Sequence, residues 1–294
     1  MAVIKKFLYR VFCGFFLGIS IVAPGFSGSI VAIIMGIYQD ILRIVSNPLK
    51  ELKKNAGFIL PLAIGGAISA VLFVFSFKYL FDTYEKATYL LFVGLIAGNL
   101  PVIYAKVREC GFKWHHLIGG VCAFAAALML GALSGGQITG ADGSAVGLHM
   151  MAFGGLAAGV TALMPGVSIS MMLILMGVYS PLLSYAETLL RLQTQYLLPS
   201  AVFVISTAAG LVLASKGIKI VFDRYPGVAN TAVLGFMAGS LVDLFIQSLR
   251  LPDPNFSIPL GALMLAAGLG ISILFVVFGK RMETRDHNAD HKSS

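Results

Sequence analysis

The stretch APGFSGS at residues 23–29 decides the fold, because the chain contains it a second time as MPGVSIS at residues 164–170. Both copies interrupt an apolar run with Pro-Gly and continue with small hydroxyl residues. The similarity extends in both directions at a constant offset of 141 residues, and it includes MGIY at 35–38 and MGVY at 176–179. Pro and Gly both weaken a helix, so a helix that only spans a membrane gains nothing from this composition. The doubled motif therefore predicts a functional site.

The composition excludes a soluble globular domain. Hydrophobic residues make up 58% of the chain, charged residues make up 12%, and the mean hydropathy is +0.89. Several apolar stretches approach or exceed the ~20 residues that cross a bilayer core of ~30 Å. The net charge is +8, but the chain has no compact basic domain that could bind nucleic acid. The charge fits instead the enrichment of Lys and Arg in cytoplasmic loops. We expect an all-α polytopic membrane protein without a nucleic-acid partner.

The cysteines indicate neither a disulfide framework nor a metal site. Cys13, Cys110 and Cys122 form no CxxC pair and have no metal-ligand spacing. We expect no bound metal and no cofactor.

The apolar segments divide the chain into two repeats and a tail. Residues 1–141 form the first repeat, residues 142–280 form the second, and residues 281–294 are polar and predict a short disordered cytoplasmic tail. Each repeat has a helix hairpin broken at Pro-Gly and then three full spans. The hairpin arms are about 7–23 with 27–45 and 151–164 with 168–183; the spans are about 57–77, 87–105, 117–133, 197–215, 228–246 and 258–278.

The number of crossings predicts that the second repeat is inverted. A helix over residues 27–42 is about 24 Å long at ~1.5 Å per residue, short of a full crossing, so each hairpin is expected to be re-entrant. Three full spans then remain in each repeat, and this odd number inverts the second repeat. If both hairpin arms cross fully, the number is five, which is also odd. Only a single broken crossing helix would give parallel repeats. The inverted topology places 17 of the 21 Lys and Arg residues in the cytoplasm, as the positive-inside rule requires. Both termini are then cytoplasmic, and the linker 134–147 is external.

The two breaks are expected to face each other inside the protein. Backbone at membrane depth leaves helical geometry only where protein or water satisfies its polar groups. Serines after each break suit N-caps, and the first-turn N–H groups form a site for an anion, as at the broken helices of secondary transporters. A Gly-packed, kinked helix pair is the structural alternative. The candidate substrate-binding residues are Pro24, Gly25, Ser27, Gly28, Ser29, Tyr38, Pro165, Gly166, Ser168, Ser170 and Tyr179.

Ionisable residues in or near membrane segments are functional candidates by default. Asp243 is a candidate for proton coupling, since Val102 stands at its repeat position. Lys78 and Lys219 each precede an Asp by four residues, which is typical of an ion pair on one helix face and also suits interfacial anchors. The candidates for coupling or charge are Asp40, Asp243, Glu187, Arg10, Lys78 and Lys219.

The doubled pattern, PGxSGS…MGxY followed by PGVSIS…MGVY, resembles the PopT-type undecaprenyl-phosphate translocases over about residues 8–280. The resemblance implies a flippase of the bacterial plasma (inner) membrane. Such a flippase returns the polyprenyl-phosphate lipid from the outer to the cytoplasmic leaflet by alternating access, for reuse in envelope and peptidoglycan synthesis. Ile169 stands where the first copy has Gly28, so the two halves cannot bind the headgroup identically. Assembly as a homo-oligomer stays open.

Two other functions stay open at this point. The first is a transporter of another anion. The second is a membrane lipid phosphatase or transferase, which needs a nucleophile with a base, or a metal cluster. No His is paired with acids at ligand spacing in the membrane segments, since His115, His116 and His149 stand in loops or at span ends. We therefore expect that the protein is not an enzyme.

Overall fold

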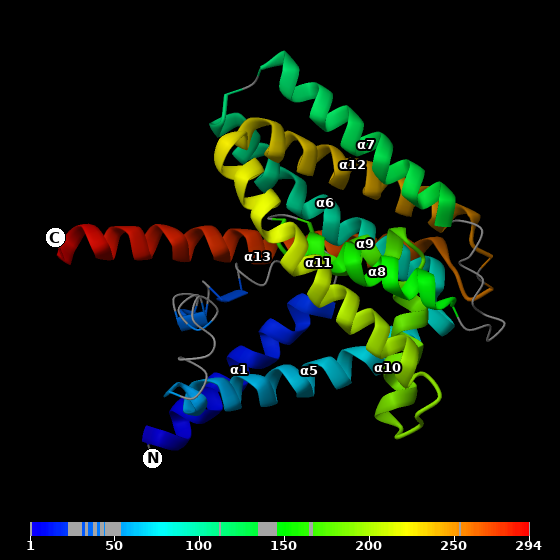
Figure 1. Ribbon diagram of the computed structural model, residues 1–294, viewed down its shortest axis with the longest axis horizontal. Coiled ribbons are helices and arrows are strands. Elements are labelled where there is room, and N and C mark those ends of the chain that lie inside the picture. The colour runs from blue at the N-terminus through cyan, green and yellow to red at the C-terminus, as the bar shows by residue number, and fades with distance from the viewer. Residues whose placement is uncertain are drawn as a thin grey trace.

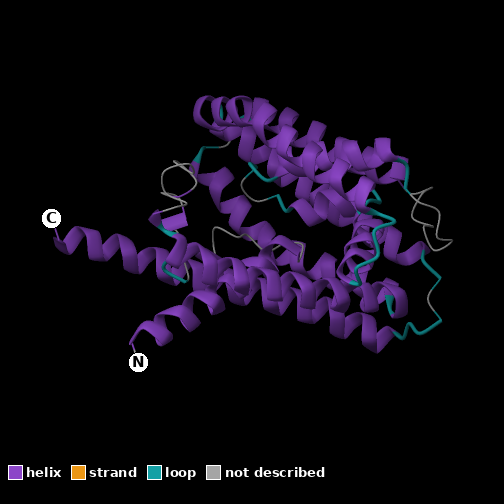
Figure 2. Cartoon of the chain, turned by 60° about the horizontal axis from the view of Figure 1, so that its bottom comes forward, coloured by secondary structure: helices purple, strands orange, loops and turns teal. Residues whose placement is uncertain are grey.

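The computed structural model describes residues 2–22, 31–32, 35–37, 40–41, 44, 54–111, 113–134, 146–164, 167–252 and 254–293. Within these ranges every regular element is a helix (Figure 2). The helices are α1 (Ala2–Val22), α5 (Ala56–Thr83), α6 (Glu85–Glu109), α7 (Trp114–Ser134), α8 (Leu148–Thr161), α9 (Ile169–Leu175), α10 (Tyr179–Leu190), α11 (Leu197–Arg224), α12 (Pro226–Arg250) and α13 (Ile258–Ser293). The predicted all-α class is confirmed.

Six of the described helices are long and apolar enough to cross a membrane: α5, α6, α7, α11, α12 and the Ile258–Phe278 part of α13. They coincide with the six full spans expected from the apolar segments, and most of them extend a few residues further at both ends. Continuing the helix into the interface keeps the backbone N–H and C=O groups paired where water is scarce. The chain is a multi-pass membrane protein.

The 141-residue offset of the sequence reappears in the helix boundaries. Both ends of α5 and α11 differ by 141 residues, and so do both ends of α6 and α12. A single tyrosine separates the helices at each junction, with φ −137° and ψ 51° at Tyr84 and φ −134° and ψ 54° at Tyr225. Equivalent stretches of sequence therefore adopt equivalent local conformations.

The packing of the helices links the two halves of the chain (Figure 1). In each half the first helix packs along the first long span, as α1 on α5 and α8 on α11. The remaining spans pack on spans of the other half: α6 packs on α13, and α7 packs on α12. α6 also contacts α12. The two halves therefore interlock around α6 and α12.

Glycines at these contacts define the direction in which paired helices run. In α6, Gly94 approaches Leu265 and Gly98 approaches Ser272 of α13. Residue numbers rise together along the contact, so α6 and α13 run in the same direction. By the same reasoning α7 and α12 run in the same direction, since Gly120 meets Thr231 and Gly131 meets Asp243.

The segment 168–183, expected as one hairpin arm, is two helices. α9 and α10 meet at an angle of 113°, so the expectation of a continuous helix is wrong. The reason is a Schellman turn: Gly177 has φ +67°, and the Val178 N–H donates to the Leu173 carbonyl oxygen at 2.9 Å. The first copy has the same features at Gly36, with φ +64°, and at the N–H of Ile37, which donates across the turn at 2.9 Å. The repeated MGxY signature is therefore a chain turn.

The C-terminal tail is also helical, which corrects the expectation of a disordered end. α13 continues from its membrane-spanning part to Ser293 and projects beyond the other helices (Figure 1). Residues 280–293 contain neither Gly nor Pro, so no strong helix breaker follows the apolar part.

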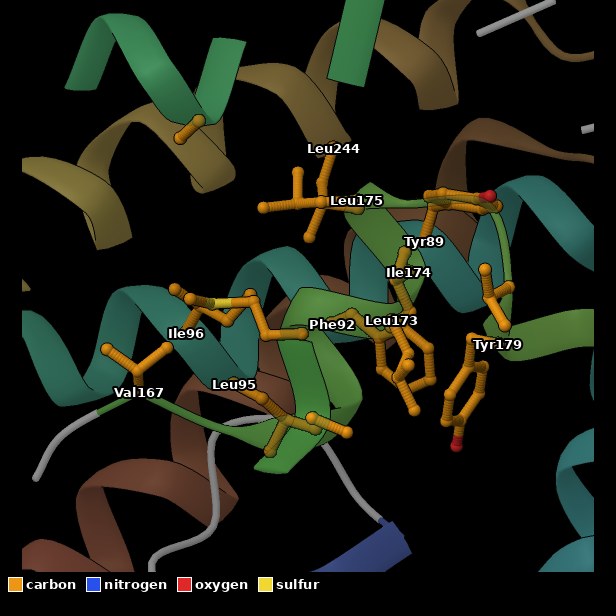
Figure 3. Packing of buried hydrophobic residues seen from close by; sticks show 14 of the residues in the cluster. Tyr89, Phe92, Leu95, Ile96, Val167, Leu173, Ile174, Leu175, Tyr179 and Leu244 are labelled. Carbon is orange, nitrogen blue, oxygen red and sulfur yellow. The ribbon is translucent and has the colours of Figure 1, made fainter. Parts of the chain in front are cut away.

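The short helix α9, which has seven residues and is called the half-helix below, lies at the centre of the buried core (Figure 3). It contacts α1, α7, α8, α10 and α12. Leu173, Ile174 and Leu175 of α9 are all buried. At the start of α10 the Tyr179 ring packs against Phe81 and Phe92, with centroids 5.8 and 6.2 Å away. The second Pro-Gly motif thus leads into the interior of the bundle.

Candidate functional site

Ser168, the hydroxyl residue that follows the second break, carries an unpaired buried oxygen. It occupies the N-cap position of α9 with φ −89° and ψ 138°, but its side chain makes no capping hydrogen bond. Its Oγ is buried and has no hydrogen-bond partner among the described residues. Leaving a buried hydroxyl unpaired costs about 1–3 kcal/mol, and such a group calls for an explanation. The Ser168 hydroxyl is therefore a candidate donor to a ligand.

The other described motif residues support the half-helix from both ends. Ser170, in the first turn of α9, is 1% exposed and takes part in a polar interaction. Tyr179 follows the turn at the opposite end of α9 and joins the aromatic cluster of α5 and α6. The structure therefore brings Ser168 and Ser170 together, and it places Tyr179 where its ring holds the turn.

The remaining motif positions lie outside the described residues: Pro24, Gly25, Ser27, Gly28, Ser29, Tyr38, Pro165 and Gly166. The ends of the flanking helices are described. α1 ends at Val22, directly before the first break, and α1 contacts α9. The helix that precedes the first motif therefore packs on the half-helix that follows the second.

Two of the basic candidates interact away from α9. The Arg10 Nη1 donates to the Gly57 carbonyl oxygen at 2.7 Å, and its guanidinium lies 5.1 Å from the centre of the Phe58 ring. Arg10 thus joins α1 to the start of α5. Lys78 donates to the carboxylate of Asp82, which confirms the ion pair expected from their spacing.

The other charged candidates are also distributed over the fold. The Glu187 carboxylate accepts from Arg191 at 2.9 Å, within α10 and the turn after it. Asp40 is half-buried and takes part in a polar or ionic interaction. The side chain of Lys219 lies outside the described residues.

Asp243 is the exception, because its carboxylate is buried between two spans. The residue is 7% exposed and its Oδ2 accepts from the Nε2 of Gln247 at 2.5 Å. A Cβ atom on Gly131 of α7 would lie 2.2 Å from both carboxylate oxygens, so only a glycine leaves room there. Sequence reasoning identified Asp243 but missed Gln247, although an Asp and a Gln four residues apart share a helix face.

The helix that carries Asp243 also contacts α9. Leu244, the next residue on α12, and Leu175, the last residue of α9, are both fully buried and belong to the same hydrophobic core (Figure 3). Ser168 stands at the other end of the same half-helix. One buried element therefore connects the unpaired hydroxyl with the buried acid.

The described residues contain no group of three or more His, Cys, Asp or Glu side chains that could hold a metal ion. The polar groups of the candidate site are the Ser168 and Ser170 hydroxyls at α9 and, on α12, the Asp243 carboxylate with the Gln247 amide.

Comparison with known proteins identifies the family. The family described as VCA0040-like, undecaprenyl phosphate translocase-like, matches residues 17–252. The chain belongs to this family. The matched range includes both Pro-Gly motifs and every helix from α5 to α12, and it confirms the resemblance recognised from the motifs. Neither the curated proteins nor the solved structures gave a match.

Proposed function

We propose that the protein is a transporter that moves undecaprenyl phosphate from the outer to the cytoplasmic leaflet of the bacterial plasma membrane. The observation that carries this proposal is the unpaired Ser168 hydroxyl at the start of a buried half-helix, in a chain of a translocase-like family. A phosphate monoester carries several strong acceptor oxygens, and hydrogen bonds to a charged group contribute about 1.5–3 kcal/mol.

The phosphate is held by the hydroxyls and the free N–H groups of the two breaks. The first N–H groups of a helix have no intrahelical acceptor, so α9 offers backbone donors beside Ser168. α9 has only seven residues, and the unpaired hydroxyl therefore supports the site better than a helix dipole does. Ser27, Gly25 and Ser29 supply the equivalent groups of the first motif, while Gly166 and Pro165 open the second. The polyprenyl tail stays in the surrounding lipid.

The repeats 1–141 and 142–280 are inverted with respect to each other in this proposal. α6 and α7 cross the membrane in opposite directions, since only a short connection joins them. Because α12 runs with α7, α12 is directed opposite to α6, its repeat partner. The 113° bend between α9 and α10 supports a re-entrant hairpin in the second repeat, and the equivalent turn at Gly36 supports one in the first. Inverted repeats around broken helices suit alternating access.

The proposed topology has cytoplasmic termini and an external linker. The N-terminus and the C-terminus lie at the same end of the molecule in both views (Figures 1 and 2), and α7 ends at the opposite one. Single cysteines at positions 144 and 293, introduced as Ser144→Cys and Ser293→Cys, should react with an impermeant thiol reagent from opposite sides of the membrane. Reaction from the same side would exclude inverted repeats.

The function is tested with purified protein in proteoliposomes that contain labelled undecaprenyl phosphate. The expected result is net movement of the phosphate headgroup across the bilayer, measured by its accessibility on each side, and loss of this movement in Ser168→Ala. Movement of inorganic phosphate without movement of the lipid would instead support a transporter of another anion. Release of phosphate from the lipid would support an enzyme.

A further inference from the structure

We propose that Asp243 and Gln247 form a binding site for one monovalent cation, either a proton or Na⁺, and that this cation drives transport through α9. The coupling part rests on the function proposed above. The binding part does not, because it follows from the polar groups of the α7–α12 interface.

The carboxylate of Asp243 lacks a compensating positive charge. Asp243 makes no ion pair with any residue in the described ranges, and Gln247 is its hydrogen-bond partner. Burying an ionised carboxylate is costly unless a counter-charge or several donors stabilise it. At membrane depth this cost makes such a residue a functional candidate. The geometry therefore calls for a cation.

The side chain of Gln247 supplies the second half of the site. Its Nε2 donates to Asp243, but its Oε1 is buried and has no hydrogen-bond partner within the described part of the chain. A protonated carboxyl could donate to this amide oxygen after a rotation of the amide group, and Na⁺, a hard cation, takes carboxylate, amide and carbonyl oxygens as ligands. Binding of either cation pairs the Oε1 and neutralises the carboxylate at once.

None of the charged groups around Asp243 in the described ranges forms an ion pair with it. On α12, Arg250 interacts with Asp243 only through space, and it is exposed in the last turn. On α6, Tyr89 interacts electrostatically with both Asp243 and Glu85, and the neighbouring Lys86 ammonium lies 4.7 Å from the centre of the Phe256 ring. α9 contains no titratable residue.

The titratable residues of the two other helices that contact α12 lie far from Asp243. Those of α7 are His115, His116 and Cys122, nearer its start than Gly131. α11 contacts α12, and its titratable residues stand near its C-terminal end, next to the start of α12: Lys216, Lys219, Asp223 and Arg224. A cation from solution is therefore the natural partner of Asp243.

The position of the site allows the cation to enter from outside. Asp243 is seven residues from the end of α12 at Arg250, or about 10 Å at ~1.5 Å per residue. The last turn of α7, which carries Gly131, ends at the same face, and that face is external in the proposed topology. From there the packing of α12 on α9, in a core that includes Leu244 and Leu175 (Figure 3), transmits a change at Asp243 along α9 to Ser168.

The site occurs once, although the sequence is duplicated. The repeat positions of Asp243 and Gln247 are Val102 and Lys106, and Ser272 stands at the repeat position of Gly131. One cation is therefore bound in each molecule.

Binding is measured without lipid substrate, by thermal unfolding of the purified full-length protein. Na⁺ is varied against K⁺ at constant ionic strength, and pH is varied in the absence of Na⁺. A ligand at tenfold excess over its Kd should raise Tm by about 3–6 °C. A response to Na⁺ at constant pH identifies Na⁺ as the ligand, and a response to pH alone identifies the proton.

Asp243→Asn should abolish the response, and Gln247→Leu should weaken it severalfold. Asp223→Asn, which changes an exposed acid at the end of α11, is the matched control and should keep it. The site is overturned if the Tm of the wild-type protein responds to neither ion. It is also overturned if Asp243→Asn responds as strongly as the wild type and the Asp223→Asn control do. If the variants do not fold, the wild-type response alone decides.

Transport is tested separately, so the two proposals can fail independently. Lipid movement without any dependence on Na⁺ or pH gradients would leave the transporter standing and overturn the coupling. Cation binding without lipid movement would leave the cation site standing and overturn the proposed substrate.

Discussion

The contact between α6 and α13 and the contact between α12 and α7 have the same backbone packing but different polar groups. A Cβ on Gly94 would lie 2.3 Å from the Leu265 carbonyl oxygen, and a Cβ on Gly235 would lie 2.0 Å from that of Gly120. In the first contact the Asn99 Nδ2 donates to the Ser272 Oγ at 2.8 Å.

At the equivalent positions the second contact has Ser240 and Gly131, and the buried Asp243 fills the space beside Gly131. Close backbone approach thus preserved the glycines in both copies, whereas the polar side chains between them diverged. The contact between α6 and α13 has the neutral Asn99–Ser272 hydrogen bond. The contact between α12 and α7 has the buried acid Asp243 and holds the candidate cation site.

The largest effect is expected from filling the close contacts. Gly94→Leu and Gly235→Leu should each destabilise the protein by about 3 kcal/mol or more, since overpacking costs about 1–3 kcal/mol even where neighbours can move and here they are backbone atoms. Thermal unfolding and monodispersity in detergent measure the loss. Gly217→Leu is the control, because no atom lies within 4 Å of its Cβ position. A stable Gly235→Leu would show that the two contacts are not equivalent.

The second effect concerns the equivalent hydroxyls Ser27 and Ser168. Ser168→Ala should lower transport or headgroup binding more than tenfold, because a hydrogen bond to a charged group contributes about 1.5–3 kcal/mol. Its Tm should stay nearly unchanged, since the hydroxyl has no partner to lose.

Ser27→Ala should behave in the same way if the halves share the phosphate. Ser215→Ala, which removes an exposed hydroxyl bonded to the Val212 carbonyl, is the matched control. Normal transport by both variants would reduce the two serines to structural residues.

The third effect comes from converting one contact into the other. The triple variant Gly131→Ser, Ser240→Asn and Asp243→Val gives α7 and α12 the residues that α13 and α6 have at these positions. It should fold, because the equivalent contact already holds these side chains, and it should lose the cation-dependent rise in Tm of about 3–6 °C. A variant that keeps this rise would locate the cation elsewhere.

The smallest effect is expected at the two chain turns. Gly36→Ala and Gly177→Ala should each destabilise by about 1 kcal/mol, since a left-handed conformation costs a residue with a Cβ about 1–2 kcal/mol and the unfolded state offsets part of it. Both glycines have a positive φ of similar size, so the two losses in thermal unfolding should agree. Gly270→Ala, in the open middle of α13, should be neutral or stabilising.

Local sequence features predicted the parts of the fold that depend on local physics. Apolar length located the six spans, and the doubled Pro-Gly motif located the entry to the half-helix α9. The predictions failed at two places: where a single glycine ended a helix, and where no helix breaker was present to end one. Gly177 ended α9 within an apolar run, and the tail after Gly279 continued as a helix.

The candidate site was predicted in its serines but not in its surroundings. Ser168 was identified from the motif, whereas the absence of a capping bond at its side chain appears only in the folded chain. Asp243 was identified from the sequence as an unusual acid, but Gln247 was not. The unpaired Oε1 of Gln247 carries a free-energy cost only once the residue is buried, and burial is not visible in the sequence.

The sequence by itself determined the duplication, the membrane spans, the positions of the helix breaks and the family. Each of these follows from composition, spacing or motif, which act along the chain. The tertiary structure alone decided that α7 packs on α12 and α6 on α13, and that Gly131 leaves room for Asp243. These residues are more than a hundred positions apart. Their proximity depends on how whole helices cross and pack, and no local pattern encodes that.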